Sequence, residues 1–220
     1  MSAPKHLVFL DATPLTHFAR IGELDRLGEW LSGSYTAAYV MKDEIIDWIK
    51  YYPHNAKVRD ATWLKTIPAD NIVDAQLIAE LSRRFPARDT KSIGELHVIA
   101  LTKRLGGTAI IEDGHARKAA QQGAGIKSTF MVSMIGAAAA CALISENDAW
   151  DLQKRLEVGR DRSVICSTNS KEFREMVRFM KELHPRWAPW PDCLHNNGLD
   201  QIAIAARKGQ LGILRGRLGL

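Results

Sequence analysis

Long hydrophobic runs and cysteine residues are both scarce in this chain of 220 residues. Its longest apolar stretch, residues 130–144, is about 15 residues long, whereas a membrane-spanning helix needs roughly 20. We therefore expect this stretch to form a buried helix, and we expect no membrane role. Near the N-terminus, Asp11 interrupts the apolar residues too early for a signal peptide.

The cysteine content and the missing motifs exclude several classes of protein. Only Cys141, Cys166 and Cys193 are present, with no C-x-x-C pair, which argues against a zinc site or a disulfide framework and favours a reducing cytoplasm. No Walker A loop, G-x-S-x-G elbow or H-E-x-x-H motif occurs. A haloacid-dehalogenase-like phosphatase would need a second aspartate where Thr13 stands.

What is present is ordinary for a globular protein, with 46% hydrophobic and 25% charged residues. The length fits one sizeable domain that folds without cross-links. The formal net charge of +5 favours an anionic partner, which makes nucleic acid a candidate.

Short apolar runs alternate with amphipathic helical stretches, and this alternation predicts an α/β fold built on a parallel sheet. The expected strands are residues 6–11, 35–40 and 107–113, with a short edge strand at 163–167. Prolines and tryptophans interrupt regular structure after residue 184, so we expect a domain over 1–184 and a helical tail over 185–220 that packs on the domain or on a partner. The expected helices cover 14–31, 42–52, 71–85, 92–105, 149–156, 171–183 and 199–208.

Carboxylates follow two of the expected strands. Asp11 ends the first strand, and Asp113 ends the strand at 107–113. The carboxyl ends of parallel strands lie along one edge, where open α/β sheets bind their ligands. We therefore expect these two acids to meet.

Two further acids are candidates for the same edge. In residues 42–52 an apolar helical face would include Trp48 and Tyr52, and Glu44 falls on that face, pointing inward. Glu95 lies in the first turn of the helix expected at 92–105, whose N-terminus would reach the same edge.

Such a cluster implies a cation. Two carboxylates about 5 Å apart repel by roughly 3 kcal/mol at an effective dielectric near 20, so without a cation some must be protonated. Oxygen ligands without cysteine or clustered histidine suit Mg²⁺ or Mn²⁺. Ions of this kind activate water for phosphodiester cleavage.

The order of these residues resembles the PIN-domain nucleases. The similarity rests on a strand ending in D-A-T at Asp11, an inward Glu44, G-E at Gly94 and a strand ending in E-D before x-x-A-R at Arg117. It covers roughly residues 5–182, and the later part is similar to the bacterial and archaeal subgroup related to VapC toxins. The glycine-rich turn departs from the family pattern, with VSMIGAAAA in place of G-T-L-G.

The resemblance implies a three-layer PIN-like fold and a metal-dependent endoribonuclease with one or two Mg²⁺ or Mn²⁺ ions. The implied partners are RNA, an antitoxin protein if the chain is a toxin, and a second copy in a homodimer. By position, the implied catalytic and metal-binding acids are Asp11, Glu44, Glu95 and Asp113, with Glu112 as a substitute for the last. Thr13 and Arg117 are the substrate-binding candidates, and His115 is a bystander close to the site.

Each candidate also has a structural interpretation. Asp11 and Asp113 could cap helices, and Glu44 could be a solvated helix residue. Ser92 and Glu95 match a capping box, and Arg117 could form a salt bridge. A non-catalytic PIN-like module that binds RNA or protein is the alternative function.

Overall fold

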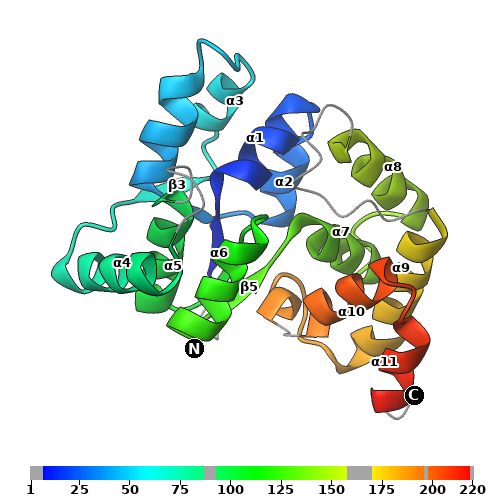
Figure 1. The fold of residues 1–220 in the computed structure, drawn as a ribbon. Helices are drawn as coiled ribbons and strands as arrows, with labels where there is room; N and C mark the ends of the chain where they lie inside the picture. Colours follow the sequence, from blue (N-terminus) through cyan, green and yellow to red (C-terminus); the bar gives the residue numbers. More distant parts are fainter. Residues whose placement is uncertain (1–6, 87–92, 158–169, 196–197, 219–220) are drawn as a thin grey trace, which may run out of the picture. The chain divides into compact units, whose positions relative to one another are not determined.

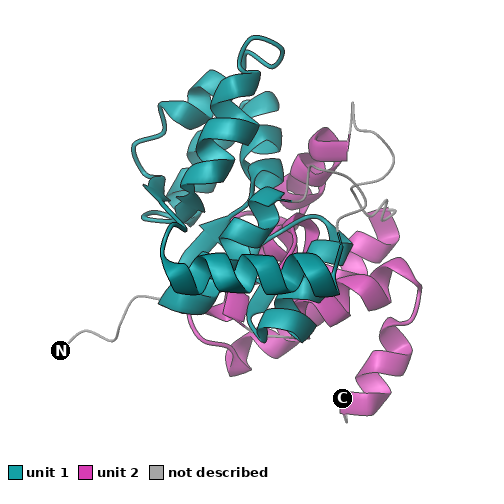
Figure 2. Ribbon diagram, turned by 60° about the vertical axis from the view of Figure 1, so that its left-hand side comes forward, with its two compact units in different colours: residues 1–128 teal, residues 129–220 magenta. Residues whose placement is uncertain are grey.

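The structure is a computed structural model that describes residues 7–86, 93–157, 170–195 and 198–218. The chain divides into two compact units, residues 1–128 and 129–220 (Figure 2).

A five-stranded sheet in the order β3-β2-β1-β4-β5 forms the centre of the fold (Figure 1). Strand β1 pairs in parallel with β2 and β4, and β2 pairs in parallel with β3. The sheet is flanked by helices, which confirms the expected α/β class. The strands are β1 (Val8–Leu10), β2 (Tyr35–Ala37), β3 (Lys65–Ile67), β4 (Thr108–Ile110) and β5 (Lys127–Thr129).

The central strands are the ones that the sequence predicted. Every residue of β1 and β4 is buried, as expected for strands covered on both faces. The buried hydroxyl of Thr36 in β2 donates to the carbonyl of Leu10 at 2.8 Å, which ties the two strands together. Strands β3 and β5 were missed because each contains at most one apolar residue and is partly exposed.

In unit 1, helix α5 packs on β1, β2 and β4, and α4 packs on α5. The single helical stretch expected at 14–31 was wrong, since Gly22 breaks it with a φ of 76°. Helix α4 begins where the side chain of Asn71 accepts the Asp74 N–H at 2.8 Å. The helices are α1 (Ala12–Arg20), α2 (Leu24–Trp30), α3 (Asn55–Arg59), α4 (Ile72–Arg84), α5 (Ile93–Leu105) and α6 (Gly114–Lys118), which continues into a π-helix, Ala119–Ala124.

The regular helix expected at 42–52 was also wrong. Val40–Ile45 forms a π-helix (η1) and Ile46–Trp48 a 3₁₀ helix (η2). A π-helix has more residues per turn than an α-helix, and a 3₁₀ helix has fewer. The residues that follow therefore do not lie on the helix face that a regular α-helical repeat predicts for them. As a result Trp48 and Tyr52, which were expected to be buried, are 43% and 51% exposed.

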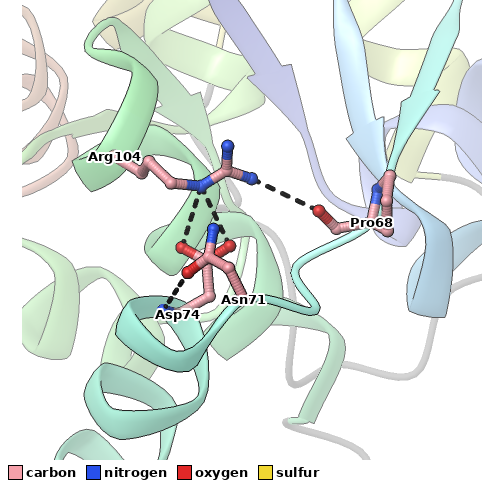
Figure 3. Close-up of polar contacts among 4 residues, drawn as sticks. All are labelled: Pro68, Asn71, Asp74 and Arg104. Atoms are coloured by element: carbon pink, nitrogen blue, oxygen red, sulfur yellow. Dashed lines mark hydrogen bonds and ion pairs between the residues drawn. The ribbon is translucent and has the colours of Figure 1, made fainter.

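A part-buried ion pair joins α5 to α4 (Figure 3). The Arg104 guanidinium, at the last turn of α5, contacts both carboxylate oxygens of Asp74 at 3.0 and 3.1 Å, and it also donates to the Pro68 carbonyl at 3.3 Å. The Asp74 side chain is only 1% exposed. Because the Arg104 side chain is 29% exposed, the pair is part-buried, and loss of Arg104 would leave the buried Asp74 carboxylate without its ion-pair partner. The pair therefore holds in place a helix whose other end carries Gly94 and Glu95.

In the described residues of unit 2, the regular structure is helical apart from the end of β5. All residues of α7 are buried, as expected for the apolar stretch 130–144, and Gly136 leaves room there for Met176 and Met180 of α9. Helix α10 packs on α7 and α9, and α11 was not anticipated. The helices are α7 (Met131–Ala140), α8 (Glu146–Glu157), α9 (Ser170–Leu183), α10 (Gly198–Arg207) and α11 (Leu211–Leu218).

The edge strand expected at 163–167 lies outside the described residues. Helix α9 ends at Leu183, and the separation of residues 185–220 as a docking tail remains a proposal. Among the described helices, none is both long and apolar enough to cross a membrane.

Candidate active site

Asp11 lies where β1 ends and α1 begins. It is the N-cap residue of α1, with φ −77° and ψ 168°, and it is 1% exposed. Burial and, to a lesser extent, the charge of Asp113 raise the pKa of its carboxyl group from 3.8 to about 6, although hydrogen bonds from the backbone N–H groups of Ala12 and Thr13 and from the Thr13 hydroxyl lower it. Within the described residues its Oδ1 atom has no hydrogen-bond partner.

Glu44 comes from η1 and reaches the N-terminus of α5. Its Oε1 atom accepts the backbone N–H of Gly94 at 3.1 Å. A side chain at Gly94 would overlap the Glu44 carboxylate, so this close approach depends on the glycine. Burial and the charge of Asp11 raise the pKa of Glu44 to about 8. The interpretation of Glu44 as a solvated helix residue does not fit this position.

Glu95 follows in the first turn of α5. Burial raises the pKa of its carboxyl group to about 9, with further contributions from Asp11, Glu44 and Asp113, while its own backbone N–H lowers it. Its Oε2 atom is buried with no hydrogen-bond partner in the described part of the chain. Ser92, the other member of the possible capping box, lies outside that part.

Asp113 and its neighbour Glu112 differ in exposure. Asp113 is exposed and caps α6, where its side chain accepts the Ala116 N–H at 2.7 Å. It therefore has the capping role considered from the sequence, and it is also close enough to raise the pKa of Asp11 and Glu95. Glu112 is 5% exposed. The choice between Asp113 and Glu112 as a ligand remains a proposal.

The other candidates are held close to these acids. Arg117 donates through one nitrogen to the carbonyls of Ile111 at 3.0 Å and Glu112 at 2.5 Å, so its guanidinium is fixed against the end of β4. Thr13 donates its hydroxyl toward Asp11. His115 packs edge-on against Phe85, and its Nε2 atom has no partner among the residues described.

Sequence reasoning overlooked two residues that position Glu44. The ring of Tyr39, just before η1, stacks on His97 of α5 with centroids 4.8 Å apart, and burial together with Asp43 and Glu44 raises its pKa. Asn55 is buried and donates to the carbonyl of Ile45 at 3.2 Å. No local signal marks either residue, because their partners are distant in sequence or depend on the π-helix.

The charge of Asp11 raises the pKa values of Glu44 and Glu95, and the charge of Asp113 raises those of Asp11 and Glu95, so these four carboxylates lie near one another. Their donors are all oxygens, and two of the buried oxygens have no partner in the described residues, which fits a hard divalent cation. Yet the described residues contain no group of three or more acidic, histidine or cysteine side chains arranged to hold an ion. The carboxylate oxygens are suitable ligands for such a cation, but the carboxylates would have to move closer together to bind it.

A parallel five-stranded sheet with buried carboxylates at its carboxyl edge defines an α/β protein of the PIN-like class. A family model described as PIN domain matches residues 7–155, which is more than half of the chain, and the chain belongs to this family. PIN domains are generally nucleases, so the family indicates a nuclease-type function. Searches of curated proteins and of solved structures gave no match.

The raised pKa values predict an unusual dependence of stability on pH. The folded pKa of Asp11, about 6, lies above its ordinary 3.8, so the folded state binds more protons in that window. The free energy of unfolding should therefore fall as pH rises through it, by about 3 kcal/mol for Asp11 alone. Glu44 and Glu95 extend the fall toward about pH 9.

Urea unfolding in EDTA at about pH 4.5 and about pH 8 measures this decrease in the free energy of unfolding. The Asp11→Asn variant should show a smaller decrease than the wild type. Asp25, an exposed aspartate in α2, provides the matched control Asp25→Asn, which should leave it unchanged. Mn²⁺ should stabilise the wild type more at the higher pH, because it binds the ionised carboxylates. A profile identical in wild type and Asp11→Asn, with no effect of Mn²⁺, would contradict the expectation.

Proposed function

We propose that this protein is a metal-dependent endoribonuclease that hydrolyses RNA phosphodiester bonds with Mg²⁺ or Mn²⁺. The observation that carries the proposal is the set of carboxylates Asp11, Glu44 and Glu95, whose pKa values are raised by complete or partial burial, with the charge of Asp11 adding to the rise at Glu44 and Glu95. Structural carboxylates usually have partners that lower their pKa, whereas shifts of this size and sign occur at functional sites.

The ligands of the proposed site are Asp11, Glu44, Glu95 and Asp113, with Glu112 as the substitute for Asp113. A bound divalent ion would activate the attacking water and neutralise charge that develops on the phosphate. Gly94 holds Glu44 in place through its backbone N–H, and Asp11 and Glu95 supply the oxygens that have no partner among the described residues. Arg117 and Thr13 would orient the scissile phosphate.

Cleavage assays on purified protein test the proposal. The wild type should cleave a single-stranded RNA substrate when Mg²⁺ or Mn²⁺ is present, and EDTA should abolish cleavage because it removes the ion from the carboxylates. Re-addition of Mn²⁺ should restore the activity, which separates metal loss from unfolding. Cleavage that persists in EDTA would contradict the metal mechanism.

A second function is favoured by one observation, which is that the described residues hold no preassembled group of metal ligands. A non-catalytic PIN-like module would bind RNA or a protein partner without cleavage. Absence of cleavage with every divalent ion, together with retained RNA binding, would support it.

Finer features of the proposed function come from the resemblance alone. They are a toxin role with an antitoxin that covers the acidic edge, and a homodimer; the proposed cytoplasmic location comes from the cysteine content. Co-expression with the product of the adjacent gene tests the first, since an antitoxin should suppress cleavage.

A further inference from the structure

Residues 46–54 form an aromatic segment on the surface of unit 1. Trp48 is 43% exposed, Tyr51 is 61% exposed and Tyr52 is 51% exposed. Large apolar side chains that gather at the surface mark interaction sites more often than scattered ones do. These three lie within five consecutive residues, so they form a patch.

The rings of the aromatic segment are arranged as a group. The Trp48 ring lies 5.5 Å from that of Tyr51 and 6.1 Å from that of Tyr52, and it is nearly parallel to the latter at 26°. The His54 ring lies 6.0 Å beyond Tyr52. The ammonium group of Lys50 sits 4.7 Å from the centre of the Tyr51 ring. Flat π-faces and one cation are thus presented together.

Hydrogen bonds hold the aromatic segment in shape. The backbone N–H groups of Tyr51 and Tyr52 both donate to the carbonyl of Trp48, at 3.0 and 2.9 Å. Ile45 and Asn55 flank the aromatic segment. Ile45 is fully buried, and the side chain of Asn55 donates a hydrogen bond to the Ile45 carbonyl at 3.2 Å. A surface whose rings are already positioned loses less conformational freedom on binding.

The segment continues directly from the candidate active site. The carboxylate of Glu44, near the end of η1, accepts the backbone N–H of Gly94. Trp48 follows four residues later, in η2. Helix η1 contacts η2, α1 and α3, so both features belong to one packed part of unit 1.

We propose that the aromatic segment is a stacking platform for the unpaired bases of single-stranded RNA whose backbone reaches the carboxylates, an inference that rests on the proposed function. Bases stack on aromatic side chains without regard to sequence, and they can do so only when they are unstacked from a helix. The segment contains one acid, Asp47, and one base, Lys50, so its contribution comes from stacking and not from net charge. The chain would therefore select single strands over duplexes.

Binding in EDTA tests the platform without any need for cleavage. Fluorescence anisotropy would compare a labelled single-stranded RNA of ten nucleotides with the matching duplex. Trp48→Ala and Tyr51→Ala should each weaken single-strand binding roughly 5- to 100-fold, and Trp48→Phe should retain most of the affinity. Ile72→Ala, which truncates a side chain that is 74% exposed in the same unit, is the matched control and should bind as the wild type does.

The ratio of the RNA affinities of the wild type and Trp48→Ala should stay the same at higher salt, even though both affinities fall. The reason is that stacking is less sensitive to salt than phosphate contacts are. Unchanged single-strand affinity, an equal loss for the duplex, or no binding by the wild type would overturn the platform. So would a Trp48→Ala protein with normal RNA affinity that sediments as a smaller species, because the rings would then contact a second copy.

These outcomes separate the two proposals. A wild type that binds single strands through Trp48 but never cleaves them would contradict only the nuclease function. A wild type that cleaves in Mn²⁺, and whose Trp48→Ala variant binds and cleaves equally well, would contradict only the platform.

Discussion

Asp11→Asn should reduce RNA cleavage by on the order of 10³-fold while the protein remains folded. Asp11 is 1% exposed at the junction of β1 and α1, and its Oδ1 atom has no partner in the described residues. Asparagine has nearly the same shape but cannot supply a negative oxygen to a cation. Initial rates at saturating Mn²⁺ measure the effect.

The same substitution should not weaken the fold. Because burial raises the pKa of Asp11, its charge costs stability near neutral pH when no cation is present, and the neutral amide avoids that cost. Asp11→Asn should thus unfold at equal or higher urea than the wild type in EDTA at about pH 8. Asp25→Asn, on the exposed side of α2, should cleave normally. Normal cleavage by Asp11→Asn would remove this carboxylate from the mechanism.

Gly94→Ala should lower cleavage by on the order of 10²-fold, although alanine is the better helix former. The added methyl group would overlap the carboxylate of Glu44, and that carboxylate would have to leave the Gly94 N–H that it now accepts. The expected cause is displacement of a ligand, so the affinity for Mn²⁺ should fall together with the rate. Calorimetric titration with Mn²⁺ checks this directly.

Gly212→Ala is the matched control for this substitution. Gly212 is also helical, in α11, and a methyl group there meets no atom within 4 Å. Alanine at this position should leave cleavage and Mn²⁺ affinity unchanged and should stabilise the helix by up to about 1 kcal/mol. If Gly94→Ala behaves in the same way, Glu44 does not need its present position for activity.

Hydrophobic pattern was sufficient to predict the buried parts of the fold. β1 and β4 are central strands covered on both faces, so the sequence must supply continuous apolar runs there. Helix α7 is buried on all sides, and its alanine-rich run gave the same signal. The edge strands β3 and β5 lacked such runs because they are partly exposed, so pattern alone could not identify them.

The candidate site was predictable in its members but not in its geometry. The placement of Asp11 and Asp113 after strands indicated the sheet edge, and the structure brings Glu44 and Glu95 close enough to Asp11 for its charge to raise their pKa values. Periodicity failed at η1 because a π-helix followed by a 3₁₀ turn breaks the repeat of 3.6 residues. That failure exposed Trp48 and Tyr52, which pattern had placed in the core.

By itself, the sequence determined the α/β class, the central strands and which acids follow them, because burial and strand order leave a periodic signal in the chain. Only the tertiary structure decided that the Glu44 carboxylate meets the Gly94 N–H, that Asp113 caps α6 and that the aromatic segment faces solvent. The contact between Glu44 and Gly94 joins residues fifty positions apart. The other two features depend on the local backbone path, and hydrophobicity encodes neither kind of information.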